Sequence, residues 1–161
     1  MAEVCQHHHH HDGPPSAEAV SGALAAADAR LSSEGDRLTP ARLRVLELLL
    51  AAGEPVKAYD LIARFGADGQ PAKPPTVYRA LEFLERKGLA HRIASISAYV
   101  ACTEGGAAHA AAFLICDCCG STAEVVAPLA EGLDRAARAA GYSISRTTVE
   151  AHGRCPACLA A

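Results

Sequence analysis

Two pairs of cysteines constrain the fold of this chain more than any other feature. Cys116 and Cys119 form one pair, Cys155 and Cys158 form the other, and 35 residues separate the pairs. Zinc binds four thiolates tetrahedrally, and two such pairs close a site that leaves no open position for a reaction. The spacing therefore predicts a structural zinc that ties the last strand of the second half of the chain to its first hairpin. Without the metal, we expect that half to unfold.

Other interpretations of the cysteines stay open at the level of sequence. They could be reduced, buried thiols, or the CPAC sequence of the second pair could carry out thiol-disulfide exchange, as thioredoxin-type motifs do. No strand-helix-strand pattern surrounds that sequence, which favours zinc. Cys118 could replace Cys116 or Cys119 as a ligand, and spacing does not decide between them.

The chain has 161 residues, half of them apolar, which is enough for one ordinary domain or two small ones. No apolar stretch approaches the roughly 20 residues of a membrane span, and no basic segment followed by an apolar run is present at the N-terminus. We therefore expect a cytoplasmic protein that does not interact with membranes and whose cysteines stay reduced or bind metal. Residues 1–15, with histidines at 7–11, cannot bury enough apolar surface to become ordered, so we predict a disordered tail.

Apolar periodicity and capping residues predict four helices followed by a hairpin. Ser16 and Thr39 can cap the first two helices, and Gly53 and Gly88 can end the second and fourth. The predicted helices cover 17–31, 40–52, about 58–65, and the stretch from Thr76 to Gly88. Two short strands, about 89–94 and 98–102, then pair around a Ser-Ile-Ser turn. This order of elements is that of a winged helix-turn-helix.

The second half of the chain follows a different pattern. Strands are predicted at about 110–116 and 121–126, a helix at 128–140 and a strand at 142–150. The fold class is therefore α+β: an N-terminal winged helix-turn-helix domain (16–102), a hinge (103–108), and a small C-terminal α/β dimerisation and metal-binding domain (109–161). Because this second domain is small and rich in alanine, we expect a partner subunit or a metal to stabilise it.

Charge is distributed unevenly along the chain, whose formal net charge is -3. Residues 37–92 hold ten basic and six acidic side chains, whereas the segments on either side are both net acidic. Only this middle segment therefore carries a positive excess suited to phosphates.

Four segments resemble one known family, namely PPTVYRALEFLERKGLAHRI, YVAC, FLICDCCG and VEAHGRCPAC. They are similar to the ferric uptake regulator superfamily, specifically its zinc uptake regulator branch, and the resemblance covers about residues 20 to 159. It implies a transcriptional repressor, not an enzyme, that binds double-stranded operator DNA as a zinc-loaded homodimer and controls zinc-uptake genes. The expected operator is an AT-rich inverted repeat, and no small-molecule substrate is implied.

The resemblance also implies a second, regulatory zinc, so that each subunit would hold two. The positions that match its ligands are His91, Cys102, His109 and Glu124. Two neutral imidazoles, a thiolate and a carboxylate carry a formal charge of -2, which cancels that of the ion, so this site should exchange zinc more readily than the four-cysteine site. The thiolate favours zinc over iron or manganese. Such an ion would join the wing to the second domain and fix the angle between them.

The fourth predicted helix carries the candidate DNA-reading residues. Arg79 can donate two hydrogen bonds to guanine, and Tyr78 can contact phosphate or base. Tyr59 matches a further DNA-contacting position of the family. The full set of predicted DNA contacts is Arg79, Tyr78, Tyr59, Thr76, Arg42, Arg44, Lys57, Lys73 and Arg86. A solvated surface explains each of the basic residues equally well.

Competing functions remain at this stage. A relative with the same fold could sense iron, manganese or peroxide. A thiol-disulfide oxidoreductase would leave the TVYRALEFL helix unexplained, and a zinc-buffering protein would leave the basic middle segment unexplained.

Overall fold

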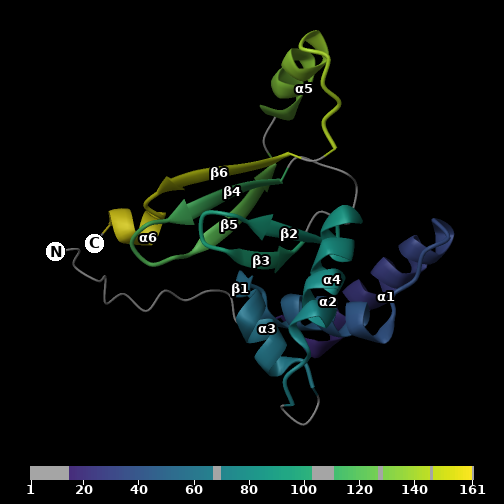
Figure 1. Ribbon diagram of the computed structural model, residues 1–161. Coiled ribbons are helices and arrows are strands. Elements are labelled where there is room, and N and C mark those ends of the chain that lie inside the picture. Colours follow the sequence, from purple (N-terminus) through teal and green to yellow (C-terminus); the bar gives the residue numbers. More distant parts are fainter. Residues whose placement is uncertain (1–14, 67–69, 103–110, 127–128, 146, 161) are drawn as a thin grey trace. The chain divides into compact units, whose positions relative to one another are not determined.

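The computed structural model describes residues 15–66, 70–102, 111–126, 129–145 and 147–160, which form two compact units (Figure 1). The first unit precedes residues 103–110 and the second follows them. The predicted hinge (103–108) and nearly all of the predicted tail lie outside the described residues. In the described part of the chain, no helix is long and apolar enough to cross a membrane.

Four helices dominate the first unit: α1 (Ala17–Ser33), α2 (Pro40–Ala52), α3 (Ala58–Arg64) and α4 (Pro74–Arg86). The Ser16 hydroxyl accepts a hydrogen bond from the Ala19 N–H at 3.2 Å, as predicted for an N-cap. Gly53 ends α2 with a φ of 64°, a left-handed conformation that favours glycine. The predicted start of α4 at Thr76 was wrong by two residues, because both prolines before it fit in the first turn, where a helix needs no N–H.

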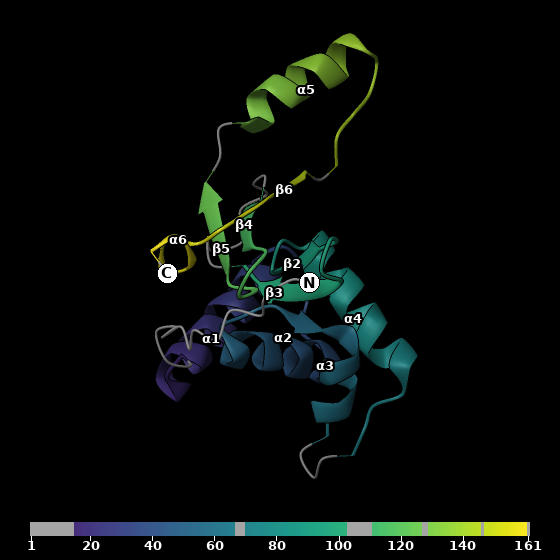
Figure 2. The same ribbon diagram turned by 90° about the vertical axis from the view of Figure 1, so that its left-hand side faces the viewer.

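Three strands complete the first unit: β1 (Val56–Lys57), β2 (Ala90–Ile93) and β3 (Ala98–Ala101), in the antiparallel order β1-β3-β2. The hairpin β2–β3 is the predicted wing. β1 was not predicted, because two residues are too few for an alternating pattern. Leu31, Leu49 and Leu84 are fully buried where the helices meet, and Figure 2 shows α2, α3 and α4 grouped beside the hairpin.

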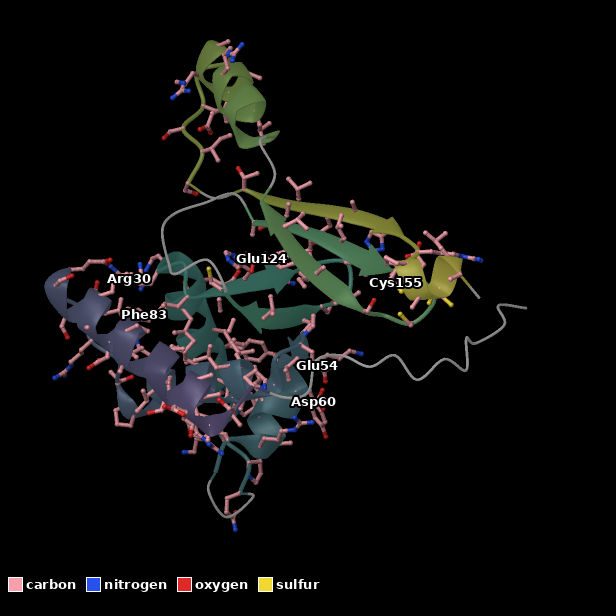
Figure 3. All side chains as sticks on the ribbon, turned by 180° about the vertical axis from the view of Figure 1, so that it is seen from behind. Arg30, Glu54, Asp60, Phe83, Glu124 and Cys155 are labelled. Atoms are coloured by element: carbon pink, nitrogen blue, oxygen red, sulfur yellow. The ribbon has the colours of Figure 1, made fainter. Side chains whose placement is uncertain are left out.

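An ion-pair network joins the end of α1 to the end of α4. Arg30 donates to the Lys87 carbonyl oxygen at 2.7 Å, while the Lys87 ammonium pairs with Glu34 at 3.1 Å and with Asp36 (Figure 3 labels Arg30). The hydrogen bond from Lys87 holds the pKa of the Asp36 carboxyl below its ordinary 3.8, and the same bond raises the pKa of Lys87 above 10.5. The network therefore fixes where α1 lies against the helix that carries the predicted DNA contacts.

The second unit contains β4 (Ala111–Cys116), β5 (Thr122–Val126), α5 (Leu129–Ala139), β6 (Thr148–Gly153) and α6 (Pro156–Leu159). The strand order is β5-β4-β6, with β4 antiparallel to β5 and parallel to β6. The predicted last strand, 142–150, was wrong: β6 starts at Thr148 and continues to Gly153, because it pairs with β4 residue for residue until Cys116 meets Gly153. The short helix α6 was not predicted.

The register of this sheet determines which side chains share each of its two faces. Leu114 pairs with Ala123 on one side and Ala151 on the other, and all three side chains are exposed, Leu114 to 50%. They border an open hollow of about 800 Å³. We call these three residues, together with Ala112, Val125 and Val149, the apolar sheet face. On the opposite face, β5 and β6 carry Glu124, Glu150 and His152, and β4 carries the buried Phe113 and Ile115 between them.

Candidate metal centre and nucleic-acid interface

The parallel pairing of β4 with β6 brings together the two segments that carry the cysteine pairs. Cys116 ends β4 opposite Gly153, and Cys155 follows two residues later as the N-cap of α6. The Asp117 N–H donates to the Gly153 carbonyl oxygen at 2.8 Å, which extends the ladder one step beyond the strand. Gly120, with a φ of 74°, turns the chain back towards β5. Both pairs therefore lie at the same end of the sheet, where β4 and β6 finish.

The sulfur atoms of Cys116, Cys119, Cys155 and Cys158 all lie within 4.8 Å of one another. The Sγ atoms of Cys119 and Cys155 are 3.7 Å apart, and Figure 3 shows Cys155 beside α6 at this end of the sheet. A tetrahedral zinc with Zn–S bonds of about 2.3 Å places its sulfurs about 3.8 Å apart. Cys116 and Cys158 are buried and the other two are half-buried. The donor set and its spacing fit a closed zinc site.

Backbone donors make part of this cluster suitable for thiolates. The N–H groups of Cys119 and Cys155 lower the pKa of the Cys116 thiol to about 6, and the Cys155 nitrogen lies 3.3 Å from that sulfur. The N–H of Cys158 lowers the pKa of Cys155. Burial raises the pKa of Cys158 to about 12. A bound cation would offset that burial, because it favours the charged form of every thiol around it.

A side-chain contact outside the sulfurs also links the two cysteine-bearing segments. The His152 Nδ1 lies 3.0 Å from an Asp117 carboxylate oxygen, and both side chains are partly exposed. His152 therefore lies next to the sulfur cluster and is not a member of it. Sequence reasoning did not identify Asp117, although its place inside the first cysteine pair is a usable signal. Cys118 is not a member of the cluster.

Two of the predicted regulatory ligands meet inside the first unit. His91 lies in β2 opposite Val100 and is the one buried polar residue of the described chain. Cys102 follows β3, and its N–H donates to the Leu89 carbonyl oxygen at 3.0 Å. A ring nitrogen of His91 lies within 4.8 Å of the Cys102 sulfur. The wing hairpin thus places an imidazole and a thiol at one point.

The other two predicted ligands belong to the second part of the chain. Glu124 is half-buried in β5, where it pairs with Phe113 of β4. His109 lies outside the described residues.

The exposed side of α4 carries the residues predicted to read DNA. Tyr78 is 51% exposed, Arg79 is exposed, and Thr76 is half-buried in the first turn. The opposite side of the helix, with Val77 and Leu84, is buried in the core of the first unit. Tyr59, at the start of α3, is 78% exposed. None of these exposed side chains is needed for packing, so they are available for a partner.

The predicted phosphate contacts fall into two groups. Lys57 and Lys73 are exposed. Arg42 and Arg86 instead approach the buried ring of Phe83, with their guanidinium carbons 3.4 Å and 5.6 Å from the ring centroid (Figure 3 labels Phe83). Both contacts have the geometry of a cation–π interaction. Sequence reasoning did not identify Phe83 as their partner.

Arg44 has the most intramolecular partners of this set. Its Nε donates to the Phe65 carbonyl oxygen at 2.8 Å and its Nη2 to the Arg64 carbonyl oxygen at 3.1 Å. Its Nη1 also pairs with Glu47 at 2.8 Å. The two carbonyls belong to the end of α3, so Arg44 caps that helix from α2.

Comparison with known proteins assigns the chain to a family. A profile of the ferric uptake regulator family matches residues 33–152. The chain belongs to the ferric uptake regulator family. Within this family, it is similar to the zinc uptake regulation proteins of Escherichia coli (strain K12) and Shigella flexneri, each 38% identical over 138 residues, which is 84% of this chain and 81% of each relative.

Solved structures of family members support the same assignment. A zinc uptake regulator in complex with zinc and DNA matches with a TM-score of 0.78 and 37% identity, covering 88% of this chain and 95% of that one. A structure described as holo XcZur matches with a TM-score of 0.76 and 42% identity, covering 89% of this chain and all of the other. The predicted family and fold class are therefore confirmed.

Proposed function

We propose that the chain is a zinc-responsive transcriptional repressor that binds operator DNA as a zinc-loaded homodimer and controls zinc-uptake genes. The observation that carries this proposal is the likeness, at 37% identity over most of both chains, to a zinc uptake regulator whose structure contains zinc and DNA. The four-cysteine cluster and the exposed face of α4 provide the chain's own residues for both ligands.

The four cysteines of the sulfur cluster would hold a structural zinc. A zinc bound there supplies a permanent cross-link rather than a reaction centre, because four protein sulfurs leave no position for a substrate. The contact of Asp117 with His152, and the Cys155 N–H that donates to the Cys116 sulfur, would help to hold the two cysteine-bearing segments in register.

A second zinc would act as the regulatory ion, with His91, Cys102, His109 and Glu124 as ligands. The proximity of His91 and Cys102 at the base of the wing supports this assignment. An ion bound by residues from both units would restrain the angle between them, and hence the separation of the two α4 helices in a dimer. Shifting a two-state equilibrium from 1:99 to 99:1 needs about 5.5 kcal/mol of differential binding, which a metal can supply.

In this proposal α4 enters the major groove. Arg79 would contact guanine O6 and N7, Tyr78 and Tyr59 would contact phosphate or base, and Lys57 and Lys73 would neutralise phosphates. Thr76 lies at the helix end that approaches the DNA. We place Arg42 and Arg44 behind these residues, because each already has a partner in the protein. Arg86 is exposed on α4 and would contact phosphate.

The apolar sheet face supports a homodimer. An exposed leucine between two alanines, next to an open hollow, is costly in water and is covered when a second copy packs against it. A two-fold dimer would present two α4 helices to the two halves of an inverted repeat, which we propose is AT-rich.

A titration of free zinc tests the proposed function. Binding to an AT-rich inverted-repeat promoter fragment is followed while a chelator buffer sets the zinc concentration, for the parent protein and for Cys102→Ser and Arg79→Ala. Binding should appear only as zinc rises and should be lost in both variants. Cys102→Ser should still retain about one tightly held zinc per subunit.

Two controls make the result specific. Cys118→Ser replaces a cysteine outside the sulfur cluster and should bind zinc and DNA as the parent does. Iron and manganese are titrated in parallel. DNA binding that ignores zinc, or that follows iron or manganese instead, would refute the proposal.

A further inference from the structure

The exposed face of α4 has an acidic residue at its centre. At 3.6 residues per turn, Tyr78, Arg79, Glu82 and Arg86 share one side of the helix, opposite the buried side chains of its core-facing stripe. Glu82 lies within this row, with Arg79 one turn before it and Arg86 one turn after it. Its side chain is exposed. Any partner that covers this face must therefore accommodate a carboxylate.

This carboxylate is not committed to a cation of the protein. Glu34 pairs with Arg30 and Lys87, and Glu47 pairs with Arg44. In contrast, Glu82 takes part in no hydrogen bond or ion pair within the described chain, although arginines precede and follow it by one turn. It is therefore free to interact with a ligand.

An uncommitted carboxylate is unfavourable on a surface that binds a polyanion, unless it faces hydrogen-bond donors. The phosphates of DNA offer none, and they repel it. In the major groove, the exocyclic amine of cytosine is a donor to carboxylates. Adenine also presents an amine, but the N7 acceptor beside it repels a carboxylate, guanine presents only acceptors, and thymine presents an acceptor and a methyl group. The chemistry of Glu82 therefore fits a base edge and does not fit the phosphate backbone.

The spacing along α4 places this contact beside the one proposed for Arg79. Three residues of helix advance about 4.5 Å along the axis. Successive base pairs are about 3.4 Å apart along one strand. If Arg79 contacts one base pair, Glu82 can reach an adjacent one.

We propose that Glu82 is a specificity-determining residue that accepts a hydrogen bond from the amine of a cytosine in the base pair next to the one read by Arg79. The inference rests on the proposed function, since it requires α4 in the major groove. In an operator that is otherwise AT-rich, such a contact would set one position of each half-site.

The test selects binding sites from a random-sequence DNA library, using the zinc-loaded full-length parent, Glu82→Gln and Glu82→Ala. The parent should select cytosine at one position of each half-site. Both variants should lose the preference for cytosine over the other bases at that position by about 5- to 150-fold, and the preferences at all other positions should stay unchanged. Glu54→Gln removes the same charge from an exposed loop of the same unit and should select the parental sequence (Figure 3 labels Glu54).

Two outcomes separate base reading from simple repulsion: a change of preference at one base position, or a uniform change of affinity for every sequence. If Glu82 only repels phosphates, both variants will bind every sequence more tightly by the same factor and no base preference will change, which overturns the inference. An unchanged preference in Glu82→Gln overturns it as well. If the parent selects no DNA sequence at any zinc concentration, the proposed function fails and this inference fails with it. Thermal unfolding of each variant verifies that Glu82 substitutions leave α4 folded.

Discussion

The basic residues of the first unit can be divided experimentally into those that hold the fold and those that bind DNA. Arg44→Met keeps much of the side-chain length and removes the three guanidinium contacts. Two of these are hydrogen bonds to carbonyl oxygens at the end of α3, each contributing roughly 1 kcal/mol. The third is a partly exposed ion pair with Glu47, which contributes a few tenths of a kcal/mol. We therefore expect the free energy of unfolding of the first unit to fall by about 2 kcal/mol.

Lys73→Met is the matched comparison, because the Lys73 side chain is exposed and, in the described part of the chain, makes no hydrogen bond or ion pair; only its backbone carbonyl contacts α4, and the substitution keeps that contact. Its stability should stay within about 0.5 kcal/mol of the parent. Its DNA affinity should fall, and the slope of log K against log salt should become shallower by about 0.9, the value for one lost phosphate contact. For Arg44→Met the slope should remain parental.

Urea unfolding measures the free energy of unfolding, and DNA binding at four or more salt concentrations measures the salt slope. The reasoning is refuted if Arg44→Met is as stable as the parent and reduces the salt slope. That result would mean that Arg44 leaves its carbonyl partners to bind phosphate.

Three further predictions follow from the same structure. Removing zinc with a strong chelator should unfold the second unit and leave the first folded, because the buried core of the first unit contains no residue beyond Ala101. Amide exchange measured residue by residue tests this, and loss of protection in both units together would contradict it. Since the pKa of Asp36 in the folded protein lies below 3.8, its contribution to stability is present above that pH and is lost as the pH falls through the folded value. The difference in urea midpoint between the parent and Asp36→Asn should therefore shrink below about pH 4. A difference that stays constant with pH would contradict the ion pair with Lys87. Leu114→Asp should weaken the dimer at least about tenfold by placing a carboxylate in the apolar sheet face, and an unchanged sedimentation profile would exclude that face from the interface.

Much of the first unit was predictable because its signals are local. Proline after Thr39 and glycine at position 53 bracket α2, and each acts through its own backbone conformation. The start of α4 was misplaced because an apolar pattern locates the buried residues of a helix. It does not show that the two prolines before them belong to the first turn. β1 escaped detection for a related reason, since two residues become a strand only through pairing with the distant Tyr99 and Ala98.

The second unit shows where local reasoning fails. The position of β6 depends on its register with β4, a contact between residues nearly 40 positions apart, and no short-range pattern encodes it. The sulfur cluster was nevertheless predictable, because paired cysteine spacing restricts the possible chemistry before any fold is known. The regulatory ligands belong to a third category. Separately, His91 and Glu124 resemble many ordinary strand residues, and only the family resemblance suggested them as a set, which remains a prediction.

The parallel pairing of β4 with β6 also orders events during synthesis. The ribosome translates the whole first unit before any residue of the sulfur cluster. Domains generally fold as units during synthesis, the N-terminal one first. Cys116 and Cys119 must then wait for α5 and β6 before their partners exist. A nascent chain therefore folds its DNA-binding unit first and completes its zinc site last. A chain released early from the ribosome would have the α4 surface and would lack the zinc cross-link.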